Sequence, residues 1–175
     1  SMRPLLICCA GGQGRCAVAG AAFGVGAHGA VFVPSGAVHG FSMMGQVLGT
    51  AMLFPSDMAR EFPEGPLHLR MRDGFQQAEL TMLGDARERE NSQNRQGAHQ
   101  AMRHYGGLIA VWLDRHSHLA EKDIEPTAAQ RLASAYAALV ERDFYKGVGV
   151  AHFAEQLGVT PTHLSRACRE SAGKN

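Results

Sequence analysis

The spacing of apolar positions changes twice along the chain. Over residues 4–83 the apolar residues form short runs, rich in glycine and β-forming side chains and separated by turn residues, which is typical of small β-sandwiches and barrels. From residue 86 to residue 119 they recur with a period of about 3.6, which predicts an amphipathic helix. A second helical region follows Pro126. The pattern therefore predicts an α+β fold: an antiparallel β-barrel, connecting helices and an all-α segment.

Strands can be placed in the first region, but their order cannot be derived from the sequence. Residues 4–10 and 15–19 are predicted strands, and the glycine-rich run 11–14 between them is predicted to be a tight hairpin turn. It does not fit a phosphate-binding loop, because no helix signal follows it. Residues 30–33 and 47–54 are two further predicted strands, each followed by a proline that ends it.

The middle region has one apolar face with a spacing of three and four residues. Its members are Ala98, Ala101, Tyr105, Leu108 and Trp112, widened by Met102 and Ile109. Gly106 and Gly107 each weaken a helix by about 1 kcal/mol relative to alanine, which predicts a bend or a close contact there. The face either packs on the barrel or forms a dimer seam between two chains, and the two roles can coexist. The polar stretch 87–96 is predicted to be a solvated helix start or a linker.

A helix is predicted to begin after Pro126. Thr127 and Gln130 have the spacing of a capping box, in which each side chain bonds the other residue's backbone amide. The apolar stripe of this helix consists of Leu132, Ala135, Tyr136, Leu139, Val140 and Phe144. Gly147 and Gly149 are predicted to end it.

The two helices that follow have the spacing of a helix-turn-helix. Gly158 suits the left-handed position after the first of them, Thr160 can cap the next, and Pro161 fits its first turn. Ala154 is small enough for a close helix crossing. The predicted apolar contacts between the helices are made by Phe153, Leu157, Val159, Leu164 and Ala167. An ordinary helical hairpin with a solvated face is the alternative.

The outward face of the last helix carries hydroxyl, imidazole and guanidinium groups, which can donate to phosphates or to base edges in a major groove. The predicted DNA-binding residues are Thr160, Thr162, His163, Ser165, Arg166 and Arg169. Composition adds little support, because 17 basic residues against 16 acidic ones give a net charge of +1. Any basic surface must therefore be local.

The four cysteines, Cys8, Cys9, Cys16 and Cys168, have no CxxC spacing, so we expect reduced thiols and a cytoplasmic protein. No run approaches the roughly 20 apolar residues of a membrane span, so we expect no membrane partner.

Residues 149–174 resemble the first helix-turn-helix of AraC/XylS-type transcription regulators, above all in Leu164-Ser165-Arg166 and Gly173-Lys174. In that family two such units in tandem read successive segments of the major groove. The resemblance implies double-stranded DNA as partner, a small-molecule effector, a homodimer and contact with RNA polymerase. Because the sequence stops after one unit, we expect a piece of a longer chain with an incomplete DNA reader.

Residues 31–41 resemble the second conserved motif of cupin barrels, which such regulators commonly use as effector sensors. The resemblance implies a cupin-like barrel with His39 at its mouth, either as a pocket residue or as a structural one. The predicted effector pocket is formed by Phe32, His39, Phe41 and Phe54, and favours an aromatic or apolar effector over a sugar. No His-x-His precedes His39 and His28 is the only other candidate ligand, so we expect no metal and no cofactor.

The sequence therefore predicts a ligand-responsive transcription regulator and not an enzyme, since the common catalytic motifs are absent and the nine histidines are scattered. The predicted domains are a sensor barrel (1–84, with its first strands missing), connecting or dimerisation helices (85–122) and a partial DNA-binding domain (126–175). A cupin-type metal-dependent enzyme and a dimerisation or adaptor module are the alternatives. The identity of the effector, the operator, and activation versus repression stay open.

Overall fold

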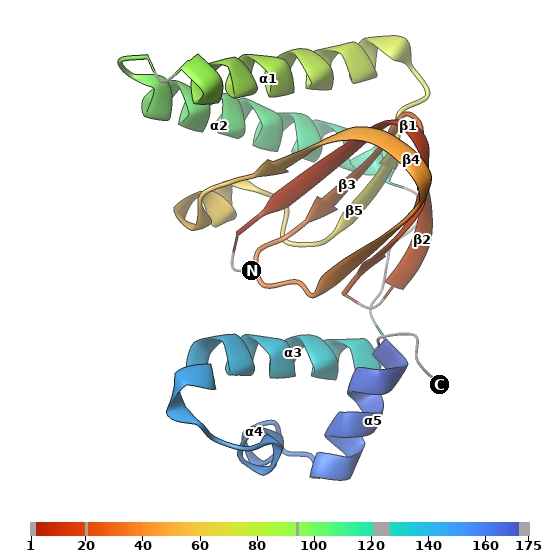
Figure 1. The fold of residues 1–175 in the computed structure, drawn as a ribbon, viewed down its shortest axis with the longest axis vertical. Coiled ribbons are helices and arrows are strands. Elements are labelled where there is room, and N and C mark those ends of the chain that lie inside the picture. The colour runs from red at the N-terminus through yellow and green to blue at the C-terminus, as the bar shows by residue number, and fades with distance from the viewer. Residues whose placement is uncertain (1–2, 20, 94, 121–126, 172–175) are drawn as a thin grey trace.

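The computed structural model describes residues 3–19, 21–93, 95–120 and 127–171. Figure 1 shows a curled sheet with two helices along one side and a separate group of three helices beyond its other end. The strands are β1 (Leu5–Val18), β2 (Ala21–Gly26), β3 (Gly29–Val33), β4 (His39–Leu53) and β5 (Leu67–Arg70). The α-helices are α1 (Gly74–Gln93), α2 (Ala98–His116), α3 (Ala128–Asp143), α4 (Val150–Gln156) and α5 (Pro161–Ser171). Three short 3-10 helices are η1 (Ser56–Glu61), η2 (Ser117–Leu119) and η3 (Phe144–Lys146).

The sheet is antiparallel, with β1 at its centre and the order β2-β1-β3-β5, while β4 pairs with the other side of β1. The first half of β1 pairs with β3 and the second half with β2, so the sheet curls into a half-barrel (Figure 1). The fold is thus a mixed α+β fold with a half-barrel of antiparallel strands. The predicted strand at 30–33 lies within β3, and most of the predicted strand at 47–54 lies within β4.

The predicted hairpin at residues 11–14 is wrong, because β1 runs through this segment as one strand. Its pairing with β4 is irregular here, with register shifts between Cys9 and Gly11 and between Gly11 and Gln13. Gly12 has a positive φ of 88°, and a Cβ atom there would clash with the carbonyl oxygen of Gln46. The glycines that read as a turn signal therefore serve a β-bulge, which needs the same backbone freedom.

The irregular segment reverses which residues of β1 face the concave side. Leu5 and Ile7 before it, and Cys16 and Val18 after it, belong to the same apolar cluster. In a regular strand an odd separation places two side chains on opposite faces. The bulged pairing therefore lets both halves of β1 contribute apolar side chains to the concave face.

The opposite face of the sheet packs against α2. Leu6, Phe32 and Phe54 join Ile109 and Leu113 in one buried cluster. Of the predicted helix face, Ala98, Ile109 and Trp112 are buried. Leu108 is 51% exposed, because the buried face is rotated towards Gly106, Ala110 and Leu113. The predicted close contact at Gly106 is confirmed, since a Cβ atom there would lie 2.9 Å from Cε of Met58.

Helix α1 begins at Gly74, inside the region that the sequence assigned to the barrel. Its buried residues are only Leu80, Gly84 and Ala86, so it lacks the apolar stripe by which a helix is recognised in a sequence. The polar stretch predicted as a helix start from residue 87 is mostly the last part of α1, which ends at Gln93.

Helices α3, α4 and α5 form a separate helical unit. Thr127 caps α3, and both bonds of the predicted capping box with Gln130 are present. The predicted stripe of α3 is wrong at its end: Phe144 is 72% exposed, because α3 stops at Asp143 and η3 turns the chain. Pro126, Gly173 and Lys174 lie outside the described residues. Among the helices described, none is long and apolar enough to cross a membrane.

Candidate nucleic-acid interface and ligand cavity

The turn between α4 and α5 is fixed by backbone bonds. Gly158 has a positive φ of 67°, and its amide donates to the carbonyl oxygen of Glu155 at 3.0 Å. The amide of Val159 donates to the carbonyl oxygen of Ala154, also at 3.0 Å. Thr160 then caps α5 by accepting a bond from the amide of His163 at 3.2 Å. The predicted turn at Gly158, the cap at Thr160 and the helix start at Pro161 are all present.

Small and apolar side chains hold these helices together. Ala154 and Leu164 have no exposed surface, and Ala167 is only 2% exposed. The ring of Phe153 meets that of Tyr136 on α3 edge-on, with centroids 5.7 Å apart. This packing fixes the direction in which the outer face of α5 points.

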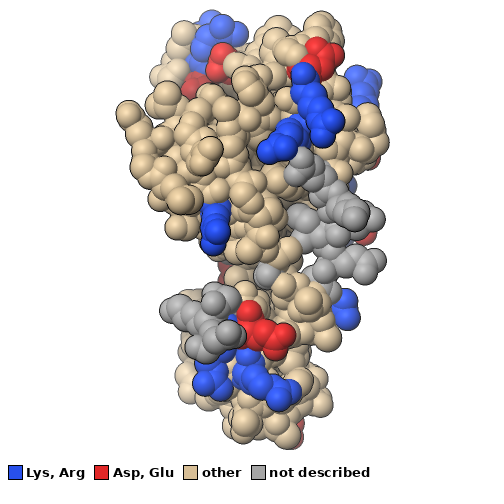
Figure 2. All heavy atoms as spheres, turned by 90° about the vertical axis from the view of Figure 1, so that its right-hand side faces the viewer, with Lys and Arg blue, Asp and Glu red and all other residues tan. Residues whose placement is uncertain are grey.

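All six predicted DNA-binding residues are exposed: Thr160, Thr162, His163, Ser165, Arg166 and Arg169. A guanidinium nitrogen of Arg166 lies 3.2 Å from Nδ1 of His163, one turn earlier on the same face. Figure 2 views the molecule from the side of α5 and shows several Lys and Arg side chains on the helical unit, beside an acidic patch. The outer face of α5 therefore presents hydrogen-bond donors and positive charge to the solvent.

An ion-pair cluster at the end of α3 was not predicted from the sequence. The side chain of Asp143 is buried and accepts bonds from Arg142 at 2.6 Å and from Lys146 at 2.8 Å. These hydrogen bonds hold the pKa of Asp143 well below its usual range. Arg142 also donates to Oε1 of Gln156 at 3.4 Å, which links α3 to α4. The sequence does contain a signal for this cluster, because Asp143 has a basic residue directly before it and another three positions after it.

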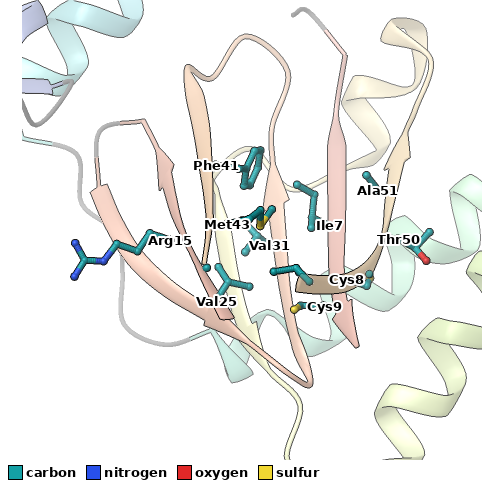
Figure 3. Close-up of a pocket in the computed structure, with 13 residues that line it drawn as sticks. Ile7, Cys8, Cys9, Arg15, Val25, Val31, Phe41, Met43, Thr50 and Ala51 are labelled. Atoms are coloured by element: carbon teal, nitrogen blue, oxygen red, sulfur yellow. The ribbon is translucent and has the colours of Figure 1, made fainter. Parts of the chain in front are cut away.

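The concave face of the half-barrel holds a cavity of about 260 Å³. Apolar or sulfur-containing side chains from β1 to β4 form most of its wall: Ile7, Cys9, Val25, Val31, Phe41 and Met43 (Figure 3). The strand pairing explains why they gather there. Ile7 pairs with both Val31 and Ala51, and Gly14 pairs with both Val25 and Met43, so each set shares one face.

The structure does not bring the four predicted pocket residues together. Phe41 lines the cavity, whereas Phe32 and Phe54 are fully buried in the cluster against α2, on the other side of the sheet. His39 points its Nδ1 at the carbonyl oxygen of Ala37 at 3.0 Å, and its ring lies 5.7 Å from that of Phe41. It lines a separate, wider hollow of about 740 Å³ beside α3. The predicted strand began only at residue 47, so the sequence did not reveal that β4 starts at His39 and that Phe41 and Phe54, an odd number of residues apart, lie on opposite faces.

Two of the cysteine thiols in β1 are held in their neutral form. Burial raises the pKa of Cys8 and that of Cys16 to about 12. The thiol of Cys9 donates to the carbonyl oxygen of Gly11. In the part of the chain that the structure describes, no three His, Cys, Asp or Glu side chains lie close enough to hold a metal ion. His28 is hydrogen-bonded through Nδ1 to Gln77.

No family model matches the chain, and no curated protein matches its sequence. Solved structures match it at low identity. The AraC-like transcriptional activator CuxR matches with a TM-score of 0.48 and 11% identity, over 99% of this chain and 62% of CuxR. ToxT from Vibrio cholerae with a bound unsaturated fatty acid matches with a TM-score of 0.43 and 11% identity, over 99% of this chain and 66% of ToxT. The chain thus spans less than two thirds of either protein, and the likeness is distant.

Proposed function

We propose that the chain is a ligand-responsive, DNA-binding regulator of transcription of the AraC/XylS type. The observation that carries this proposal is the geometry of α4 and α5: a sharp turn at Gly158, a close crossing at Ala154, and an exposed polar and basic face on α5. A helix held this way can enter the major groove while its neighbour lies across the phosphate backbone.

The chemistry of the exposed residues supports two kinds of contact. Arg166 and Arg169 can donate to phosphate oxygens or, in a bidentate manner, to guanine. Thr160, at the amino end of α5, lies where helix amides attract phosphate. Thr162 and Ser165 add neutral donors, which suit either bases or phosphates.

We assign the sensor role to the half-barrel, with the small-molecule effector in the cavity on its concave face. The connecting helices α1 and α2 then form the second part and α3–α5 the DNA reader.

Leu108 and Val111 lie one turn apart on α2 and are 51% and 46% exposed, which favours a homodimer contact through this helix. Contact with RNA polymerase would follow from the type of regulator. The cavity wall is apolar and carries no paired acid and base, so a binding role suits it better than catalysis.

The test is selection of bound sequences from a pool of random DNA duplexes, followed by affinity measurement by fluorescence anisotropy. We expect recovery of a shared motif of a few base pairs, and tighter binding to it than to a scrambled duplex of the same composition. Equal affinity for both duplexes would refute sequence-specific regulation. When an exposed arginine of α5 is replaced by alanine, Arg115→Ala on α2 is the matched control, because it removes one exposed arginine at a site away from α5.

A further inference from the structure

The side chains that face the cavity provide no charge. Ile7, Val25, Val31 and Phe41 are hydrocarbon, and Met43 adds a thioether. The thiol of Cys9 is already bonded to the carbonyl oxygen of Gly11. A ligand that fills this space therefore meets apolar surface and weakly polar sulfur atoms.

Among the residues that the structure describes, Arg15 is the one charged residue at the cavity rim. Its side chain does not point into the cavity. It pairs with Ser42 and Gly24, which share the face opposite to that of Gly14, Val25 and Met43. Figure 3 shows its guanidinium extending away from the cavity. A carboxylate in the cavity would thus lose water without gaining a partner, which is strongly unfavourable.

The size of the cavity limits the ligand. The small Ala51 forms part of the wall, where a larger side chain would fill the space. Gly14 and Gly49 also line it, but a Cβ atom at either would meet a backbone oxygen of the neighbouring strand. An apolar cavity of about 150 Å³ holds benzene. A cavity of about 260 Å³ suits a ligand closer to two fused rings. Met43 is 52% exposed, so the wall at β4 is open enough to admit it.

We infer that the cavity binds an uncharged aromatic or apolar molecule of about bicyclic size and discriminates against organic anions of the same shape. This inference rests on the proposed sensor role and names the ligand class of that site.

The test uses naphthalene, indole and 2-naphthoate as probes, with affinities for the whole chain measured by ligand-observed NMR and calorimetry. We expect naphthalene and indole to bind, and 2-naphthoate to bind at least about tenfold more weakly than naphthalene. Ala51→Phe should abolish binding by filling the cavity. Ser42→Phe adds the same side chain to the same strand on the opposite face, and should leave binding unchanged.

A second variant keeps the test decisive if Ala51→Phe does not fold. Met43→Lys places a cation at the cavity wall, so it should weaken naphthalene binding and strengthen 2-naphthoate binding. If the unaltered chain bound 2-naphthoate as tightly as naphthalene or more tightly, the inference would be overturned, and loss of that binding in Arg15→Gln would identify Arg15 as the anion's partner. Failure of both neutral probes to bind would also overturn it. DNA binding is measured separately, so a failed ligand test leaves the DNA-binding proposal standing, and a failed DNA test leaves the ligand affinities interpretable.

Discussion

Gly106 lies where α2 meets η1, and it shows how one missing side chain sets a helix contact. A Cβ atom there would lie 2.9 Å from Cε of Met58 and 3.4 Å from a ring carbon of Phe54. Met58 is itself almost fully buried. At the neighbouring Gly107, the nearest atom would be a carboxylate oxygen of Glu61 at 3.4 Å. The two glycines are consecutive residues in the interior of α2, but only Gly106 lies against the buried core.

Valine at these two positions should separate packing from helix propensity. Gly106→Val should lower the free energy of unfolding by about 1–3 kcal/mol more than Gly107→Val, because only the first overpacks the core. Urea unfolding followed by circular dichroism measures both. Equal stabilities would contradict the contact with Met58.

Asp143 predicts a pH dependence for the helical unit. Arg142 and Lys146 lower its pKa, so the carboxylate stabilises the folded state above its unfolded pKa, and this contribution is lost as the pH falls through the lower folded value. Asp143→Asn should therefore lower the melting temperature at pH 7, with a deficit that shrinks as the pH falls below about 4. Thermal melts at several pH values measure this. Glu155→Gln, an exposed change on α4, should show no such deficit, and a constant deficit for Asp143→Asn would argue against the ion pairs.

Helix α5 begins with a cap whose strength can be tested against a neighbour. The hydroxyl of Thr160 accepts a bond from the amide of His163, whereas Thr162 lies exposed on the helix surface. Thr160→Ala should cost about 1 kcal/mol of stability, and Thr162→Ala much less. Chemical unfolding of the two variants gives the comparison. Equal losses would show that the cap bond contributes nothing.

The elements differ in how far local sequence determines them. The turn at Gly158, the cap at Thr160 and the capping box at Thr127 depend on residues within one helical turn of each other, so the sequence predicts them. The course of β1 depends on pairing with β4, which is distant in sequence. A glycine run fits a hairpin turn and a β-bulge equally well, and the choice decides which residues in the second half of β1 face the concave side. Val25 was missed as a cavity residue for another reason: it lies in β2, which was not among the predicted strands.

The whole molecule has separate apolar cores. The two clusters of the half-barrel and its helices contain no residue of α3–α5, while Phe153, Leu164 and Ala167 are buried within the helical unit. The sensor and reader roles proposed for the two parts thus correspond to two packed units among the described residues.

Two cores predict two unfolding transitions. Leu113→Ala should destabilise only the half-barrel unit and Leu164→Ala only the helical unit, each by about 2–5 kcal/mol, because both side chains are fully buried. Scanning calorimetry of the whole chain, with the two variants as mutual controls, measures the effect. One transition that both variants shift equally would show that the units unfold together.

The central claim is that α5 binds DNA through its exposed face. The most direct measurement is the affinity of the chain and of its Arg166→Ala variant for a selected duplex, over a series of salt concentrations. We predict affinity that falls with salt, and a loss of about 1–3 kcal/mol for Arg166→Ala if it reads a base, or a salt slope smaller by about one if it contacts a phosphate. Arg115→Ala should match the unaltered chain. Identical affinity and salt slope for Arg166→Ala and the unaltered chain would contradict the claim.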